Sequence, residues 1–257
     1  PFVGRAAGCD HRAMAKAEKN TPRKANPADT RKRRPQHERR MESTTLILDS
    51  AEAEFAKKGF NGTTLASVAK VAGIDTSLMR YYFGDKEQLF EAVFRRRGPI
   101  LDHLRRQAFA NYEARVGKAM TLEGIIDAFI RPGLELSIDD EAWRNYDAIV
   151  SYVNSSGGEW RRLMSEVFDD TAQLMLSYMR RVLPDAADEE LYWGYHFLSG
   201  GFTFSLGQTG RIDGLSKGLV SSRDLQAILD RLPIVFAAGI RTLCESRKKA
   251  PARRQRK

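Results

Sequence analysis

The sequence has 257 residues, enough for one large domain or two modest domains with a buried core. Its 42 lysines and arginines exceed its 33 acidic residues, and the formal net charge of +9 favours binding to nucleic acid or to an acidic surface. Two cysteines are too few for a disulfide framework or a paired-cysteine zinc site and fit a reducing compartment, so we expect a cytoplasmic protein.

The positive charge is concentrated at the two ends of the chain. Residues 1–40 carry 12 basic and 4 acidic side chains, and residues 247–257 carry 7 basic and no acidic ones. The part between them, 41–246, is mildly acidic. We therefore expect a disordered basic arm over 1–40 and a disordered basic tail over 247–257. Because the sequence starts with proline, Met14 or Met41 could begin the natural product, and the arm is either a DNA contact or a non-natural extension.

Helical periodicity begins at Ser43. Apolar residues recur at spacings of three and four up to Gly59, which predicts a first helix. Thr63 can accept a hydrogen bond at the start of a second short helix over 65–72. Gly73 then permits a tight turn.

A third helix is predicted over 76–83, with Asp75 as its cap. Met79 and Phe83 fall on its inner side, and Asp85 starts the next helix with Gln88 three residues on. The opposite side of the third helix is polar, aromatic and cationic, so something outside the fold should meet it. That side holds Thr76, Ser77, Arg80 and Tyr81.

The rest of the chain is predicted to be helical nearly throughout, with no run that alternates like a strand. The fold class is therefore all-α. Pro132 and Gly133 should kink or split one helix, and Pro233 should bend the last. The predicted helices cover 100–116, 122–136, 141–154, 159–183, 188–206 and 222–246, with breaks that include Gly98–Pro99 and the glycine-rich stretch 207–218.

Two short helices joined by a glycine turn form a helix-turn-helix, whose second helix fits the DNA major groove. A helical hairpin inside a bundle is the plain alternative. The stretch from Gly59 to Leu89 reads GFNGTTLASVAKVAGIDTSLMRYYFGDKEQL. It resembles the N-terminal DNA-binding domain of the TetR family of bacterial transcriptional regulators, and the resemblance covers about residues 43–98.

The resemblance implies which residues contact DNA. Arg80 offers a fork that suits guanine, although many members place tyrosine there, while Tyr82 and Lys86 suit phosphate oxygens. Leu78 could touch a thymine methyl group or cover the core. The DNA contacts expected from the resemblance are Thr63 or Thr64, Thr76, Ser77, Leu78, Arg80, Tyr81, Tyr82 and Lys86.

The remaining residues resemble the variable ligand-binding and dimerisation domain of the same family. This implies a helix-turn-helix domain over 41–98, a larger helical domain over 99–246, and a homodimer that pairs through its last two helices on a pseudo-palindromic operator. Small residues there would allow close helix approach, either between subunits or within one, namely Gly200, Gly201, Ala237, Ala238 and Gly239. Candidate contacts to a small-molecule effector are Tyr146, Tyr152, Met164, Phe168, Met175 and His196.

Catalytic signatures are missing from the sequence. It holds no Gly-x-Ser-x-Gly, phosphate-loop or dinucleotide motif, its four histidines are scattered, and the acidic run Asp139-Asp140-Glu141 is explained as a helix start. We expect no cofactor, no metal, no membrane span and no enzyme activity. The sequence predicts a regulator, usually a repressor in this family, that a small molecule releases from DNA; the alternative is a helical-bundle enzyme or ligand carrier with an incidental helix-turn-helix.

Overall fold

The structure, a computed structural model, describes residues 36–248. Most of the predicted arm and tail therefore lie outside the described residues. Between 36 and 248 the fold is all-α and contains no strand, as predicted. The helices are α1 (Gln36–Gly62), α2 (Leu65–Ala72), α3 (Thr76–Phe83), α4 (Lys86–Val116), the short 3-10 helix η1 (Gly117–Ala119), α5 (Leu122–Asp139), α6 (Glu141–Ser156), α7 (Gly158–Val182), α8 (Asp188–Leu206), α9 (Arg211–Leu215) and α10 (Leu225–Lys248).

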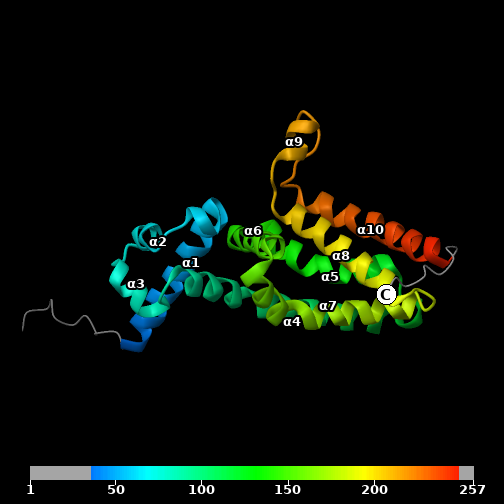
Figure 1. The fold of residues 1–257 in the computed structure, drawn as a ribbon, viewed down its shortest axis with the longest axis horizontal. Coiled ribbons are helices and arrows are strands. Elements are labelled where there is room, and N and C mark those ends of the chain that lie inside the picture. Colours follow the sequence, from blue (N-terminus) through cyan, green and yellow to red (C-terminus); the bar gives the residue numbers. More distant parts are fainter. Residues whose placement is uncertain (1–35, 249–257) are drawn as a thin grey trace, which may run out of the picture.

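Helices α1, α2 and α3 form a small domain at one end of the elongated molecule (Figure 1). Their apolar sides meet the first turns of α4 in one cluster. Its fully buried members include Ile47, Val68, Met79 and Leu89. The spacing of these residues placed them on the inner sides of the predicted helices, so the core of this domain follows from periodicity.

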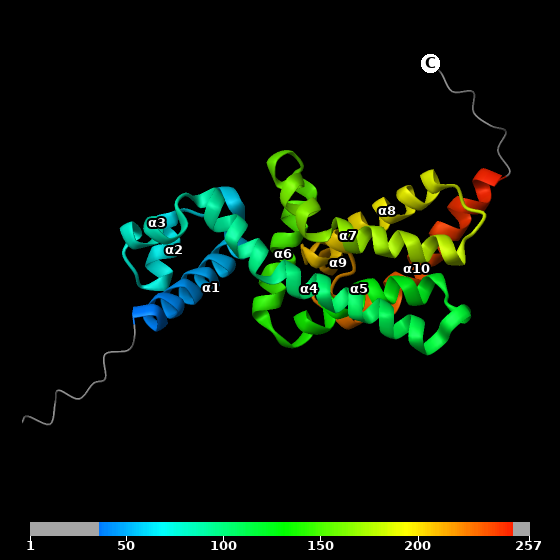
Figure 2. The ribbon, with the colours of Figure 1, turned by 90° about the horizontal axis from the view of Figure 1, so that it is seen from below.

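Helix α4 extends from the small domain deep into the larger one (Figure 2). The predicted break at Gly98–Pro99 is wrong, because α4 continues through both residues to Val116. Phe94 and Leu101, one turn to either side, are buried against other helices. Tertiary packing on both sides of the proline thus holds one continuous rod, which links the two domains mechanically.

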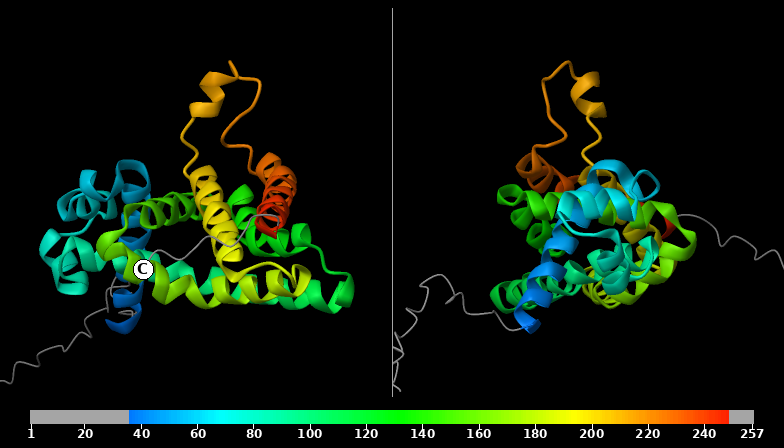
Figure 3. Two further views of the ribbon diagram at one scale, coloured as in Figure 1. Left: turned by 45° about the vertical axis from the view of Figure 1, so that its right-hand side comes forward. Right: turned by 90° about the vertical axis from the view of Figure 1, so that its left-hand side faces the viewer.

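The larger domain is built from α4 to α8 and α10, with α10 packed on α5 and α8. Helices α5 and α10 also run through Pro132 and Pro233 without interruption, so Pro132 does not split α5. The kink predicted as the alternative at Pro132 and the bend predicted at Pro233 stay predictions. The glycine-rich stretch 207–218, predicted as a break, contains the short helix α9. With its flanking loops α9 forms an arm that stands away from the helical body (Figures 1 and 3).

Close approach of α8 and α10 depends on a small residue. A Cβ atom on Gly201 would lie 2.4 Å from the Phe236 ring, and Ala237 is fully buried. These two small residues therefore pack within one subunit. Gly200, Ala238 and Gly239 are exposed and remain available to another molecule.

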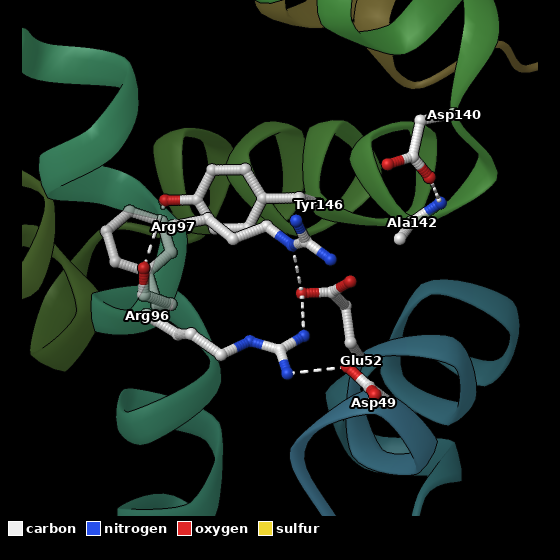
Figure 4. A network of polar contacts seen from close by, with 8 residues as sticks. Asp49, Glu52, Arg96, Arg97, Asp140, Ala142 and Tyr146 are labelled. Atoms are coloured by element: carbon white, nitrogen blue, oxygen red, sulfur yellow. Dashed lines mark hydrogen bonds and ion pairs between the residues drawn. The ribbon is translucent and has the colours of Figure 1, made fainter. Parts of the chain in front are cut away.

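A buried carboxylate joins the two domains. Glu52 of α1, only 2% exposed, accepts hydrogen bonds from Arg96 Nη2 at 2.9 Å and from Arg97 Nε at 2.8 Å, both on α4 (Figure 4). Arg96 Nη1 also donates to Asp49 at 2.6 Å. We refer to Asp49, Glu52, Arg96 and Arg97 as the joint cluster.

The joint cluster extends onto α6. The Arg97 guanidinium lies 4.9 Å from the ring centroid of Trp143, and the Tyr146 hydroxyl donates to the carbonyl oxygen of Phe94 at 3.0 Å. Both α6 residues are buried. Helices α1, α4 and α6 are thereby held at one point by charge, a cation–π contact and a hydrogen bond.

Glu52→Gln should lower the free energy of unfolding by about 3 kcal/mol, because it leaves two partly buried guanidinium groups without their shared carboxylate. Urea unfolding measures this. The matched control is Asp49→Asn, since Asp49 is exposed and its loss should cost about 1 kcal/mol or less. Equal effects of the two substitutions would contradict a structural role for the buried carboxylate.

Candidate functional site

The turn between α2 and α3 is set by short-range contacts. Gly73 adopts φ +66°, a left-handed conformation that glycine tolerates, and ends α2. The Asp75 carboxylate then accepts from the Ser77 backbone N–H at 2.7 Å and starts α3. These two residues fix the angle at which α3 leaves the turn.

The threonine cap of α2 differs from the prediction. Thr64, not Thr63, is the cap, and its hydroxyl accepts from the Ser67 backbone N–H at 3.0 Å. The Thr63 side chain is fully buried and donates to the carbonyl oxygens of Glu54 and Gly59, at 3.1 Å and 2.9 Å. Of the two candidate threonines, only Thr64 is exposed and available to DNA.

The outer side of α3 is open to solvent along its length. Tyr81 is 76% exposed and Leu78 is 37% exposed, so Leu78 does not serve as core. Arg80 is exposed as well, and Met79 on the opposite side is fully buried. The Ser77 hydroxyl is already used, since it donates to the Asp75 carboxylate at 2.5 Å.

The two predicted phosphate contacts lie at the edge of this surface and are partly engaged. Lys86 Nζ donates to the Phe60 carbonyl oxygen at 3.1 Å and lies 4.1 Å from the Phe60 ring centroid. The half-buried Tyr82 ring lies 5.8 Å from the Arg40 guanidinium. Arg40 therefore brings one further positive charge to this edge. The predicted DNA contacts that are exposed or half-buried are named the DNA-facing surface, and they are Thr64, Thr76, Ser77, Leu78, Arg80, Tyr81, Tyr82 and Lys86.

Two family descriptions match the chain. "Bacterial regulatory proteins, tetR family" matches residues 47–93, which hold the helix-turn-helix, and "Tetracyclin repressor-like, C-terminal domain" matches residues 127–239. The chain belongs to the TetR family. The family resemblance seen in the sequence is confirmed, and so is the arrangement of a helix-turn-helix domain followed by a helical ligand-binding domain.

Curated relatives are similar to the chain over a short segment. The HTH-type transcriptional regulators BetI of Burkholderia thailandensis and of Paraburkholderia phymatum are each 45% identical to the chain over 49 residues. Those residues are 19% of this chain and 25% of either relative, so the chain spans about a quarter of the curated relatives it matches.

One solved structure resembles nearly the whole described chain. The fatty acid degradation regulator FadR from Bacillus halodurans covers 77% of this chain and 96% of its own length, with a TM-score of 0.52 and 16% identity. That likeness shows a shared fold alone. It supports the TetR architecture outside the short segment that the curated relatives share.

The six predicted effector contacts are not gathered around one cavity. Tyr146 and Met175 are fully buried, and Phe168 is nearly so. Tyr152 and Met164 are half-buried at the edge of the cluster that joins the small domain to α6 and α7. His196 is exposed on α8, with its ring centroid 5.6 Å from that of Trp193. As effector contacts the six stay predictions.

Two cavities of about 860 Å³ lie elsewhere in the molecule. One lies between α1, α5, α6 and the start of α10, and is lined by polar residues such as Lys57, Arg144 and Asn145. The other lies between the α9 arm, α8 and α10, and is mostly apolar, with Phe204 and Leu219 on its walls. Neither is lined by any of the six predicted effector contacts.

Sequence reasoning missed the buried charged residues of the larger domain, two of which lie on α4 and α6. Arg105 of α4 is 6% exposed and Asp147 of α6 is 2% exposed. The signal was present, because Arg105 falls four residues from both Leu101 and Phe109 on the apolar side of α4. A charge at an inward position has to be paired or functional.

Burial acts on the protonation of both groups. Removal from water raises the pKa of the Asp147 carboxyl to about 7, which outweighs the opposing effects of the nearby Ser137 hydroxyl and Arg105 charge. Burial also lowers the pKa of the Arg105 guanidinium, which still carries its charge at neutral pH. Asp147 is therefore part protonated near neutrality.

Replacing Asp147 should change how stability depends on pH. The carboxyl has a higher pKa folded than unfolded, so folding binds a proton between about pH 4 and pH 7 and stability falls as pH rises through that range. Asp147→Asn removes this loss, and its stability advantage should grow to at most about 4 kcal/mol at pH 8, from about three pH units at 1.36 kcal/mol each. Urea unfolding at pH 5, 6, 7 and 8 measures it.

The exposed Asp139→Asn is the control for Asp147→Asn, since it should show no such growth with pH. A stability difference between Asp147→Asn and the unsubstituted protein that stays constant from pH 5 to pH 8 would contradict the raised pKa.

Proposed function

We propose that this chain is a homodimeric, sequence-specific DNA-binding repressor that leaves a pseudo-palindromic operator when a small-molecule effector binds its larger domain. The observation that carries the proposal is the exposed outer side of α3, where Leu78, Arg80 and Tyr81 face solvent while Met79 anchors the helix. These exposed side chains are not part of the core. An α-helix that carries them fits a DNA major groove, where they can contact base edges.

The DNA-facing surface supplies both reading and positioning groups. Arg80 can donate two hydrogen bonds to a guanine edge, and Leu78 can contact a thymine methyl group. The start of α2, capped by Thr64, presents backbone N–H groups to a phosphate. Residues 41–98 hold equal numbers of basic and acidic side chains, so we propose that the basic arm adds phosphate contacts.

Dimer formation is supported by an apolar surface on the last two long helices. Trp193, Phe197 and Phe204 of α8 are 47%, 54% and 63% exposed, and Ile234 and Val235 of α10 are each 63% exposed. Solvent-exposed apolar residues that gather on neighbouring helices typically mark an interface. A two-fold dimer through this surface would present two copies of α3 to successive major grooves.

The joint cluster and α4 couple effector binding in the larger domain to the position of the DNA-binding helices. Helix α4 is continuous from the DNA-binding domain to the interior of the larger domain, and α1 is tied to it through Glu52. An effector that prefers one position of α4 therefore shifts the population between two spacings of the paired α3 helices. One spacing fits the operator and the other does not.

Selection of bound genomic fragments followed by sequencing tests the DNA-binding proposal. The expected result is a pseudo-palindrome whose half-sites lie about one DNA turn apart. On the selected fragment, Arg80→Ala should weaken specific binding about 10- to 100-fold, as measured by mobility shift, because a bidentate base contact is lost. Arg211→Ala, an exposed arginine of α9, should leave binding unchanged. Intact specific binding by Arg80→Ala would show that α3 does not read the operator.

The dimer is tested by Val235→Lys, which places a charge in the exposed apolar surface of α10 and should shift the protein from dimer to monomer in sedimentation velocity. Ile100→Lys is the control, because Ile100 is 49% exposed on α4 and outside the proposed interface. A Val235→Lys protein that sediments as an unchanged dimer would exclude this face of α10 as the interface.

A further inference from the structure

Arg105 is a buried cation on which the charges of Asp147 and Asp102 act, but it forms no ion pair within the described residues. Its Nε donates to the Phe129 carbonyl oxygen at 3.0 Å, which is the hydrogen bond found for its guanidinium within residues 36–248. The group lies 4.3 Å from the Phe129 ring centroid and 5.3 Å from that of Phe168. No ion pair joins it to a carboxylate in the described part of the chain. Its four Nη hydrogens have donor capacity that the protein does not use.

Asp147 of α6 is a buried carboxyl group with an unused hydrogen-bonding atom. Its Oδ2 atom is buried and has no hydrogen-bond partner among the described residues. Ser137 of α5 also acts to lower the pKa of this carboxyl, but its hydroxyl donates to the Gly133 carbonyl oxygen at 3.0 Å. Orphaned buried polar atoms are rare in proteins, and each one requires an explanation. Asp147 Oδ2 is such an atom, and Arg105 on α4 is near enough to interact with this carboxyl electrostatically, but no hydrogen bond or ion pair joins the two residues.

We propose that Arg105 and Asp147 together bind the carboxylate of a small organic effector. One ligand oxygen accepts hydrogen bonds from the Arg105 Nη groups, and another accepts the proton of the neutral Asp147 carboxyl from Oδ2. The apolar part of the ligand packs against the rings of Phe129 and Phe168, which already flank the guanidinium. The inference rests on the proposed effector-released repressor, and it assigns the chemical class of that effector.

The location of the pair gives such a ligand a direct effect on DNA binding. Arg105 stands on α4 about two turns beyond Arg97, and Asp147 directly follows Tyr146, which holds α6 to α4 through the Phe94 carbonyl. A carboxylate that pulls these two side chains together moves α4 relative to α6. Both helices meet α1 at the joint cluster, so the movement reaches the DNA-binding domain.

The test measures binding of acetate, butyrate, octanoate and benzoate to the full chain by calorimetry and by thermal unfolding, at constant ionic strength set with chloride. Each is compared with its primary amide. We expect saturable binding by at least one carboxylate and at least tenfold weaker binding by its amide. Absence of saturable binding by all four carboxylates, or equal binding of acid and amide, overturns the proposal.

Substitutions locate the bound carboxylate. Arg105→Met should abolish binding, and Arg105→Lys, which keeps the charge but loses the fork, should weaken it at least tenfold. Asp147→Asn keeps a hydrogen-bond donor at the position of the protonated carboxyl and should retain binding. The matched control is Arg106→Met on the exposed side of α4, which should bind as the unsubstituted protein does. Unchanged binding by a folded Arg105→Lys protein overturns the proposal even if Arg105→Met fails to fold.

Failure of this inference is distinguishable from failure of the proposed function. The same carboxylates are added to the protein bound to its selected DNA fragment, and release is measured by mobility shift. Binding that depends on Arg105 without release supports the carboxylate site and contradicts the effector-released repressor. Specific DNA binding by a protein that no carboxylate occupies supports the regulator and overturns the site.

Discussion

The arrangement of the molecule depends on one buried carboxylate. Glu52 receives two arginines from α4 and thereby fixes α1, and the DNA-binding helices packed on α1, to the rod that enters the larger domain. Such a cluster is costly to bury and costly to break, so it favours a defined geometry over added stability. A defined geometry is what a protein needs if a shift at one end is to change the spacing of α3 at the other.

Apolar clusters hold the helices together, while the larger domain also buries charged side chains. The small domain is held by an apolar cluster that it shares with α6 and α7, and the members of this cluster tolerate little deviation because interiors are tightly packed. The larger domain has a separate apolar cluster around α5, α8 and α10, and charged Arg105 and Asp147 near its boundary with the first. Buried charges that are not matched within the protein are where an added molecule gains the most free energy, because it supplies the missing partners.

Much of the DNA-facing surface was predictable from the sequence because its geometry is local. The Gly73 turn, the Asp75 cap and the outward position of Arg80 depend on residues within a few positions of one another. The error between Thr63 and Thr64 has a non-local cause: the Thr63 hydroxyl is taken by the carbonyl oxygen of Glu54, nine residues earlier. Local pattern alone could not tell which threonine would face away.

The sequence by itself determined the helical fold class, the family and the position of the helix-turn-helix, since helical periodicity, caps and turn glycines act over three or four residues. Only the tertiary structure decided that α4 continues through Pro99, that His196 is exposed, and that Arg105 and Asp147 are buried, with the Asp147 Oδ2 atom lacking a hydrogen-bond partner among the described residues. These outcomes depend on contacts between segments far apart in the chain, such as Arg96 with Asp49, which lie 47 residues apart. No pattern within one helix specifies which distant helix will cover it.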